Sequence, residues 1–303
     1  MGRPSILIVG GDSAIGAAAA RVLQARDVPV LATTRRPEAA AMPARLHLDL
    51  AAPLDGWTPP AGIRTAVIAA AAARLADCAA DPDATARVNV AGTLALVRRL
   101  VEARVHIVFL STDKVFPGTR PRVPAHAPHA PRSAYGRQKA AAEAGLAAVP
   151  HAPHAILRLS KVVPPDFPLV RDWHAALAAG RPVRAFADMA LAPVPLALAA
   201  EAISAIVLRR AHGVYQLSGP QDVTYLEVAQ RLARRLGAPA NLVTPQAARA
   251  AGQPEGADAA HTTLDSSAIE TLLGRAVPGP WEVLDEAMGM RPASRMAGIA
   301  AGG

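Results

Sequence analysis

The first 161 residues alternate short apolar runs with helix-forming segments. A parallel strand needs such a crossover to return to the same edge of a sheet, so the alternation predicts a parallel, doubly wound α/β sheet. The runs are apolar at successive positions, which predicts helices on both faces of the sheet. The expected strands are 5–9, 28–33, 45–50, 65–71, 105–111 and 155–161, and the expected helices are 14–25, 83–103, 133–149 and 223–236.

A glycine-containing turn follows the first expected strand. Gly10, Ser13 and Gly16 are spaced as Gly-x-x-Ser-x-x-Gly, and the turn leads directly into helix 14–25. Glycines here let the backbone approach a pyrophosphate, which the helix N-terminus binds through its N–H groups and dipole. An ordinary βα turn has the same outline, but the order of strand, turn and helix at the start of the chain favours a dinucleotide site.

The end of the second expected strand favours a phosphorylated dinucleotide. An NAD site places a carboxylate there for the ribose 2′-hydroxyl, whereas this chain has Thr34 followed by Arg35 and Arg36. Guanidinium groups bind a 2′-phosphate, which a carboxylate would repel. NADPH is therefore favoured over NADH. Asp49, at the end of the third expected strand, is a candidate contact for adenine or a turn-forming aspartate.

A tyrosine and a lysine stand one helical turn apart. Tyr135 and Lys139, at positions i and i+4, share one face of the expected helix 133–149. An ammonium beside a phenol lowers the pKa of the phenol, and such a tyrosine can exchange a proton with an alcohol or alkoxide. Thr112, at the end of strand 105–111, is placed to hydrogen-bond a substrate carbonyl. These three residues are the expected catalytic set.

The chain has only 3 lysines among its 32 basic residues. Lys114 and Lys161 fall at the ends of expected strands, and Lys139 falls on the expected catalytic helix. Because the carboxyl ends of strands line the ligand crevice of an α/β sheet, this placement favours a role at the site over coincidence. Lys114 and Lys161 are therefore candidate substrate contacts.

Composition and charge argue against several other classes of protein. A single cysteine, Cys78, permits neither an intrachain disulfide nor a zinc cluster of thiolates. The net charge of +8 is carried by scattered basic residues without aromatic residues between them, so no nucleic-acid partner is expected. His126 and His129 lie in the Pro-rich stretch 117–131 without a third ligand at a suitable spacing, so no metal is expected.

No targeting or membrane segment is recognisable in the sequence. The apolar run 6–9 is too short for a signal peptide. The most apolar long window, 189–208, contains Pro193, Pro195 and Glu201, which argue against a membrane span. We therefore expect a cytoplasmic protein without a membrane partner.

The regular alternation stops after Lys161, where two prolines follow at 164–165. We expect an NAD(P)-binding Rossmann domain over residues 1–162. Residues 163–290 are expected to form a smaller mixed α/β substrate domain that packs partly back on the Rossmann sheet. Residues 291–303, rich in Ala and Gly, are expected to be a disordered tail.

These motifs make the chain similar, over essentially its whole length, to the extended short-chain dehydrogenases/reductases. Within them it most resembles the dTDP-4-dehydrorhamnose reductase group, which binds nucleotide sugars. The segment 111–118 (STDKVFPG) matches the group's Ser-Thr-Asp-x-Val-Phe-x-Gly, and Cys78 and Asn89 fit one of its helices. The segments 157–161 (LRLSK) and 213–219 (GVYQLSG) look like its sixth strand and a late strand.

The resemblance implies a role for each site residue. Thr112 would polarise the C4 ketone of a nucleotide-linked 4-keto-6-deoxy sugar, Tyr135 would protonate the forming alkoxide, and Lys139 would hold the nicotinamide ribose of NADPH, the hydride source. Asn89 would support sheet–helix packing or a water near the site. The expected cofactor contacts are Gly10, Asp12, Ser13, Ile15, Gly16, Arg35, Arg36, Asp49, Leu50, Ala70, Ala71, Asn89 and Lys139, and the expected substrate contacts are Lys114, Lys161 and Asp188.

The sequence also departs from the group. Lys114 stands where these reductases usually carry Tyr, which leaves the substrate open, and the Glu of the related 4,6-dehydratases is absent, which argues against a dehydratase. A nucleotide-sugar epimerase with bound NAD(P) and a non-catalytic NAD(P)-binding protein of the same fold remain as alternatives. Small residues at 140–142 and at Ala144 favour close packing of helix 133–149 between subunits, which predicts a homodimer.

Overall fold

One seven-stranded sheet forms the centre of the computed structural model, which describes residues 5–289. The strand order is β11-β6-β5-β4-β1-β2-β3, and every neighbouring pair is parallel. The order reverses between β1 and β4, where sheets of this kind bind ligands. The parallel, doubly wound sheet expected from the sequence is confirmed. Its strands are β1 Ser5–Val9, β2 Val30–Thr34, β3 Arg45–His47, β4 Ile63–Ile68, β5 His106–Thr112, β6 His154–Leu159 and β11 Gly213–Leu217.

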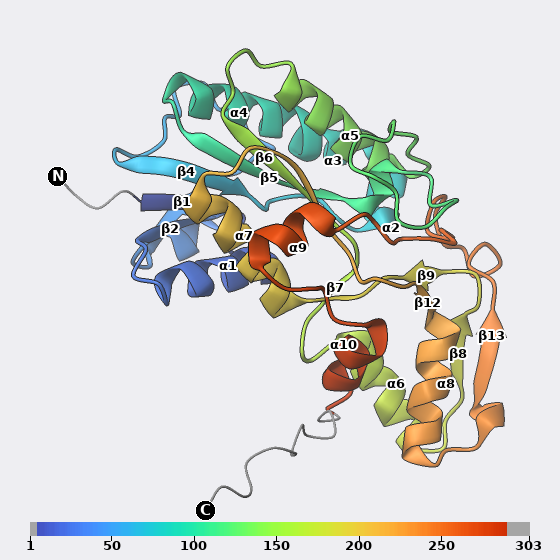
Figure 1. Ribbon diagram of the computed structural model, residues 1–303. Coiled ribbons are helices and arrows are strands. Elements are labelled where there is room, and N and C mark those ends of the chain that lie inside the picture. The colour runs from blue at the N-terminus through green and yellow to red at the C-terminus, as the bar shows by residue number, and fades with distance from the viewer. Residues whose placement is uncertain (1–4, 290–303) are drawn as a thin grey trace, which may run out of the picture.

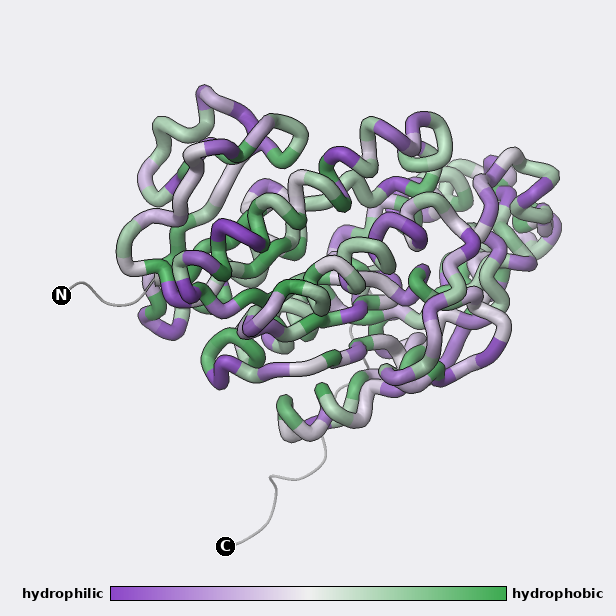
Figure 2. Tube along the Cα trace, turned by 90° about the horizontal axis from the view of Figure 1, so that it is seen from above, coloured by the Kyte–Doolittle hydropathy of each residue, from purple (hydrophilic) through white to green (hydrophobic). Residues whose placement is uncertain are grey.

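Helices cover both faces of this sheet (Figure 1). In β1, Ile6 and Ile8 pack towards α1 and α7, whereas Leu7 and Val9 pack towards α4 and α5, because successive side chains of a strand point to opposite faces. Figure 2 shows the hydrophobic residues concentrated along the inner strands and helices. The helices are α1 Ala14–Gln24, α7 Leu196–Arg209 and α9 Ser267–Leu273 on one face, and α2 Leu75–Ala80, α3 Pro82–Ala86, α4 Thr93–Glu102 and α5 Ala134–Ala147 on the other.

The remaining elements form a smaller part with its own apolar core, at the lower right of Figure 1. β8 pairs parallel with β13, and β9 pairs antiparallel with β12. However, β11, α7 and α9 also follow residue 162 in the chain and pack on the main sheet, so the domain boundary stays a prediction. The elements are β7 Val162–Val163, β8 Val183–Phe186, β9 Ala190–Leu191, β10 Val194–Pro195, β12 Val223–Thr224, β13 Val243–Gln246, α6 Pro168–Ala178, α8 Tyr225–Leu236 and α10 Pro280–Ala287.

Two helices differ from the sequence-based expectation for local reasons. The expected helix 83–103 is divided by a π-helical turn over Arg87–Gly92, which separates α3 from α4. The expected helix 223–236 begins only after Thr224, whose hydroxyl accepts a hydrogen bond from the Glu227 backbone N–H while the Glu227 carboxylate accepts one from the Thr224 N–H. This reciprocal capping fixes the start of α8 and leaves Thr224 in strand β12.

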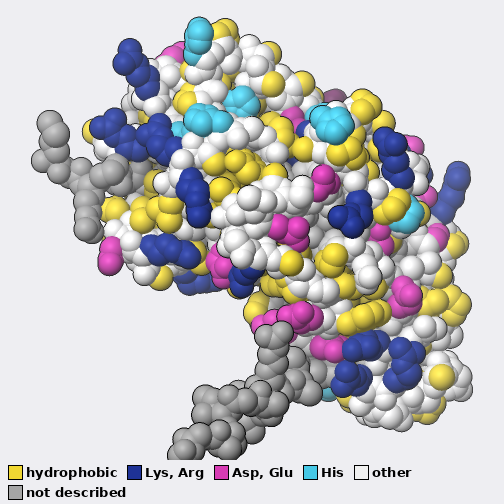
Figure 3. Space-filling view, in the orientation of Figure 1, with side chains coloured by type: hydrophobic (Ala, Val, Ile, Leu, Met, Phe, Trp, Pro, Cys, Tyr) yellow, Lys and Arg dark blue, Asp and Glu magenta, His cyan; other side chains and the backbone are white. Residues whose placement is uncertain are grey.

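Two further observations concern the molecule as a whole. Within residues 5–289, no helix is both long and apolar enough to cross a membrane. On the face drawn in Figure 3, the Lys and Arg side chains lie in separate small groups, with acidic and apolar side chains between them. The tail expected at 291–303 lies outside the described residues.

Candidate active site

A cavity of about 500 Å³ opens at the carboxyl ends of the central strands. Its walls come from the segments that follow β1, β4, β5 and β6, from α5, and from the C-terminal part of the chain. This is the edge of the sheet where ligands of doubly wound folds bind. Of the sequence-predicted site residues, it brings together Ser13, Ile15, Ala71, Thr112, Lys114, Tyr135, Lys139 and Lys161.

The glycine turn leaves room at one end of the cavity. Gly10 has a φ of +89°, and a Cβ there would lie 2.6 Å from the backbone nitrogen of Ala70, so only glycine fits. The Ser13 hydroxyl donates to the Gly10 carbonyl (2.8 Å) and accepts from the Gly16 N–H (3.0 Å). Ser13, which stands where a middle glycine would be usual, thus caps the N-terminus of α1. The first turn of α1 lines the cavity, which is the position expected of a helix N-terminus that binds an anion.

Asp12 lies in the same turn and connects it to the end of β2. Its carboxylate accepts a 2.6 Å hydrogen bond from the Thr34 hydroxyl and pairs with Arg45 at 2.9 Å and with Arg36 at 3.5 Å. The Thr34 hydrogen bond, with the two arginine charges, holds the pKa of Asp12 below its usual value. Asp12 therefore carries a negative charge beside Arg36, one of the two arginines that the sequence assigns to a 2′-phosphate, and beside Arg45, which the sequence did not assign.

The Asn89 side chain is buried, with 1% of the residue exposed, and has a structural role. Its side-chain amide accepts from the Ala72 N–H (2.8 Å) and donates to the Ala72 carbonyl (2.9 Å) and to Gln138 Oε1 (2.7 Å). Asn89 thus joins the segment after β4 to α5 and does not line the cavity. Asp49 does not line the cavity either. Its Oδ1 accepts a hydrogen bond from the Ala51 N–H, and this forms the turn that the sequence allowed as an alternative.

Tyr135 and Lys139 line the cavity from α5. The helix begins beside the end of β5 because Gly136 packs directly against the Lys114 carbonyl, where a Cβ would collide. Lys139 is 2% exposed, and its Nζ lies 3.8 Å from the centroid of the Phe109 ring, a cation–π contact. Burial lowers the pKa of Lys139 to about 7, against the opposing charge of Glu143.

The pKa of Tyr135 shifts in the direction opposite to the one expected from the sequence. Burial of the phenol, followed by the negative charge of Asp113, raises this pKa well above its usual value. The neighbouring lysine alone would lower this pKa, but desolvation of the anionic phenolate is the larger effect in this cavity. Tyr135 therefore holds its proton at neutral pH.

Thr112 ends β5, and its hydroxyl is engaged locally. It donates to the Asp113 carboxylate (3.0 Å) and accepts from the Lys114 N–H (3.2 Å), which starts a short 3₁₀ turn. The neighbouring Ser111 hydroxyl also faces this cavity; it is buried and has no hydrogen-bond partner among the residues that the structure describes. Ser111 is therefore a second hydroxyl available to a substrate carbonyl, and no feature of the sequence distinguishes it for this role.

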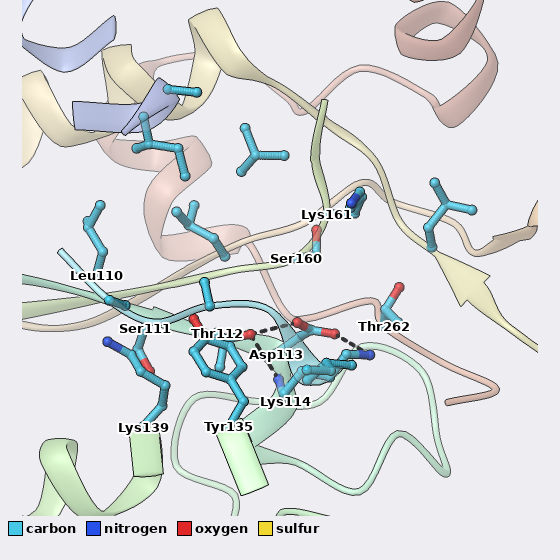
Figure 4. A pocket seen from close by; sticks show the side chains of 18 of the residues that line it. Leu110, Ser111, Thr112, Asp113, Lys114, Tyr135, Lys139, Ser160, Lys161 and Thr262 are labelled. Carbon is cyan, nitrogen blue, oxygen red and sulfur yellow. Dashed lines mark hydrogen bonds and ion pairs between the residues drawn. The ribbon is translucent and has the colours of Figure 1, made fainter. Parts of the chain in front are cut away.

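Figure 4 shows Thr112, Asp113 and Tyr135 on one side of the cavity and Ser160 and Lys161 on the other. Lys114 pairs with Asp113 at 3.4 Å. The wall that closes this end comes from the C-terminal part of the chain and contains Met189, Tyr225, Ala257 and Thr262. No local motif marks these residues, so only the folded chain identifies them.

Asp188, a sequence-predicted substrate contact, and His129, from the Pro-rich stretch, both lie away from the cavity. The exposed Asp188 accepts two hydrogen bonds from the Ala248 N–H (2.8 and 3.1 Å) and braces a loop, so the structure does not bring it to the cavity. His129 contacts Arg158 (2.8 Å) and Glu143 (3.3 Å) instead of a partner histidine. Within residues 5–289, no group of His, Cys, Asp and Glu side chains is arranged to hold a metal ion.

The order reversal of the parallel sheet and the glycine turn beside it define a Rossmann-like, doubly wound fold, and Tyr135 and Lys139 line its cavity together. The chain belongs to the family described as RmlD substrate binding domain, whose model matches residues 4–288. A search of curated protein sequences gives no significant match.

Solved structures share the fold at low sequence identity. A hypothetical dTDP-4-dehydrorhamnose reductase from Sulfolobus tokodaii is 21% identical with a TM-score of 0.76, covering 89% of this chain and 95% of that one. A dTDP-4-dehydrorhamnose reductase from Bacillus anthracis, in complex with NADP, is 17% identical with a TM-score of 0.75, covering 96% and 98%. A UDP-glucose 4-epimerase from Thermus thermophilus, in complex with NAD, is 22% identical with a TM-score of 0.77, covering 94% and 98%.

Proposed function

We propose that the protein is an NADPH-dependent reductase of a nucleotide-linked 4-keto sugar, with the 4-keto-6-deoxy sugars as the first substrates to test. The observation that carries this proposal is a single cavity with the glycine turn and the α1 N-terminus at one end and Tyr135 and Lys139 at the other. A dinucleotide that extends between them would present its reactive ring beside the tyrosine. The names of the structurally similar reductases support the choice of substrate.

The residues of the cavity fit a nicotinamide dinucleotide. The bare backbone at Gly10 and the first turn of α1 would hold the pyrophosphate, and Arg36 and Arg45 would face a 2′-phosphate. Lys139 would donate to the nicotinamide ribose. When bound, the cofactor supplies the hydride. Similar structures have been solved with NADP and with NAD, and the arginines favour NADPH.

The raised pKa of Tyr135 suits the direction of reduction. A phenol that keeps its proton at neutral pH can donate it to the strongly basic alkoxide that forms when a ketone is reduced. The unpartnered Ser111 hydroxyl would hold the carbonyl oxygen beside Tyr135, and Thr112 would join it when its hydroxyl turns from the Asp113 carboxylate to the substrate. Lys139, with a pKa of about 7, would orient the ribose and replace the proton that Tyr135 loses.

The experiment is to follow NADPH absorbance with a panel of nucleotide-linked 4-keto sugars and to analyse the sugar product. We expect oxidation of NADPH by the wild type, and a rate lower by about 10²- to 10⁴-fold in Tyr135→Phe, because that variant lacks the proton donor. NADPH binding, measured by fluorescence titration, should be retained. Tyr215→Phe is the matched control, because Tyr215 lies on β11 and does not line the cavity.

Other outcomes would select one of the alternatives. An altered sugar without net loss of NADPH would identify an epimerase, which transfers the hydride out and back. Binding of NADPH without any change to a panel sugar, and with no effect of Tyr135→Phe, would favour a non-catalytic binding protein of the same fold.

A further inference from the structure

All 3 lysines of the chain line the same cavity. Lys139 lies over the Phe109 ring, and Lys114 pairs with Asp113. Lys161 has no carboxylate of residues 5–289 within ion-pair distance of its Nζ, which lies 5.3 Å from the centroid of the Phe167 ring. It differs from Lys139, which is also without an ion pair among these residues, in being exposed. Asp113 is the one acid among the described lining residues. Among the three lysines, Lys161 is therefore the exposed cation of the cavity that no carboxylate of the described residues pairs with.

Lys161 lies at the reacting end of the cavity. It follows β6, and Figure 4 shows it across the cavity from Thr112, Asp113 and Tyr135. Although Lys161 is exposed as a whole, the surrounding cavity walls lower the pKa of its ammonium by desolvation, and the charges of Asp113 and Lys114 also act on that pKa. Its ammonium is therefore within electrostatic reach of the turn that begins at Thr112.

The chemistry of a nucleotide-linked sugar limits which group could face this lysine. The diphosphate is attached at C1, on the opposite side of a pyranose ring from C4. When the C4 carbonyl lies beside Tyr135 and Thr112, the diphosphate points away from them. An anion that meets Lys161 at the reacting end is therefore carried on a ring carbon beside C4. A charged hydrogen bond to that anion would offset the desolvation of the ammonium.

We propose that Lys161 binds an acidic substituent of the sugar, a carboxylate on C5 in place of the methyl group of a 6-deoxy sugar. The substrate class would then be a nucleotide-linked hexuronate rather than a neutral sugar. This inference rests on the proposed function, since it needs a nucleotide sugar with its C4 beside Tyr135. It specifies a carboxylate at C6. Because a 4-keto hexuronate is a β-keto acid that can lose CO₂, the hydride and proton transfers at C4 must precede that loss.

The test is to measure the dissociation constants of UDP-glucose and UDP-glucuronic acid by calorimetry, with NADP saturating. These probes differ only at C6, so the contribution of the nucleotide cancels in their ratio. We expect the wild type to bind UDP-glucuronic acid about tenfold more tightly. Lys161→Met should bring the ratio to about one with UDP-glucose binding little changed. Arg99→Met removes a positive charge on α4, outside the cavity, and should keep the preference.

Two results would overturn the inference. Equal binding of both probes to the wild type, together with reduction of a neutral 4-keto sugar, would contradict the acidic substituent and leave the proposed function intact. Equal weakening of both probes by Lys161→Met would assign the lysine to the diphosphate. If NADP binds but neither these probes nor dTDP-glucose does, the proposed function is overturned as well. A thermal unfolding curve shows whether each variant is folded.

Discussion

At the scale of single residues, Asp12 is the side chain most at odds with the proposed cofactor. Its charged carboxylate pairs with Arg36 and Arg45, which a 2′-phosphate would also need. We expect Asp12→Asn to lower the dissociation constant of NADPH by about five- to tenfold and to leave that of NADH nearly unchanged, because the repulsion and the competition for guanidinium groups both disappear. Fluorescence titration of both cofactors measures this, with Asp49→Asn as the control. A parallel change for the two cofactors would contradict the placement of the 2′-phosphate.

At the scale of secondary-structure elements, a buried ion pair connects α5 to the sheet. Arg158 on β6 and Glu143 on α5 are 4% and 3% exposed, with Nη2 and Oε2 2.7 Å apart. Arg158 also donates to the Ala125 carbonyl (2.8 Å), which ties the Pro-rich loop to the same point. The pair therefore positions the helix that carries Tyr135 and Lys139.

Breaking one side of this pair should cost more than removing both sides. Arg158→Met leaves the buried Glu143 carboxylate with His129 as its remaining neighbour, and we expect the loss of the arginine charge to lower the free energy of unfolding by about 3–5 kcal/mol. The double variant Arg158→Met/Glu143→Leu should recover a large part of that loss, since no uncompensated charge remains. Urea unfolding of the wild type and both variants measures the difference. A double variant no more stable than Arg158→Met would show that the hydrogen bonds of Arg158 to the loop matter more than the charge.

At the scale of the whole molecule, the buried His106 links stability to pH. Its ring is fully buried on β5, and burial lowers its pKa to about 4. The folded state disfavours the protonated ring. The free energy of unfolding is therefore unaffected by His106 above about pH 6.5, and it falls by about 3 kcal/mol as the pH is lowered towards 4. His106→Gln keeps a donor for the Ala211 carbonyl and does not titrate. Urea unfolding at pH 7.5 and 4.5 should show a smaller acid loss in this variant than in the wild type; equal losses would contradict the prediction.

The sequence predicts the sheet well because its signals are local. The apolar runs, the glycine turn and the tyrosine–lysine spacing each lie within a few residues of one another, and the structure brings their side chains to one cavity. The C-terminal wall could not be predicted, because Tyr225 and Thr262 reach the cavity through long-range packing that leaves no motif. The pKa of Tyr135 was predicted in the wrong direction, because burial depends on surroundings that spacing does not reveal.

The position of β11 has a consequence for how the chain folds during its synthesis. The sheet is complete only when residues 213–217 pair with β6. One of its faces is covered by α7, which comes just before β11 in the chain, and by α9, which comes after it. A ribosome that has released only the first 162 residues therefore exposes an unpaired strand edge and an apolar sheet surface. Such a nascent chain is open to association with other chains or to chaperones until its second half emerges.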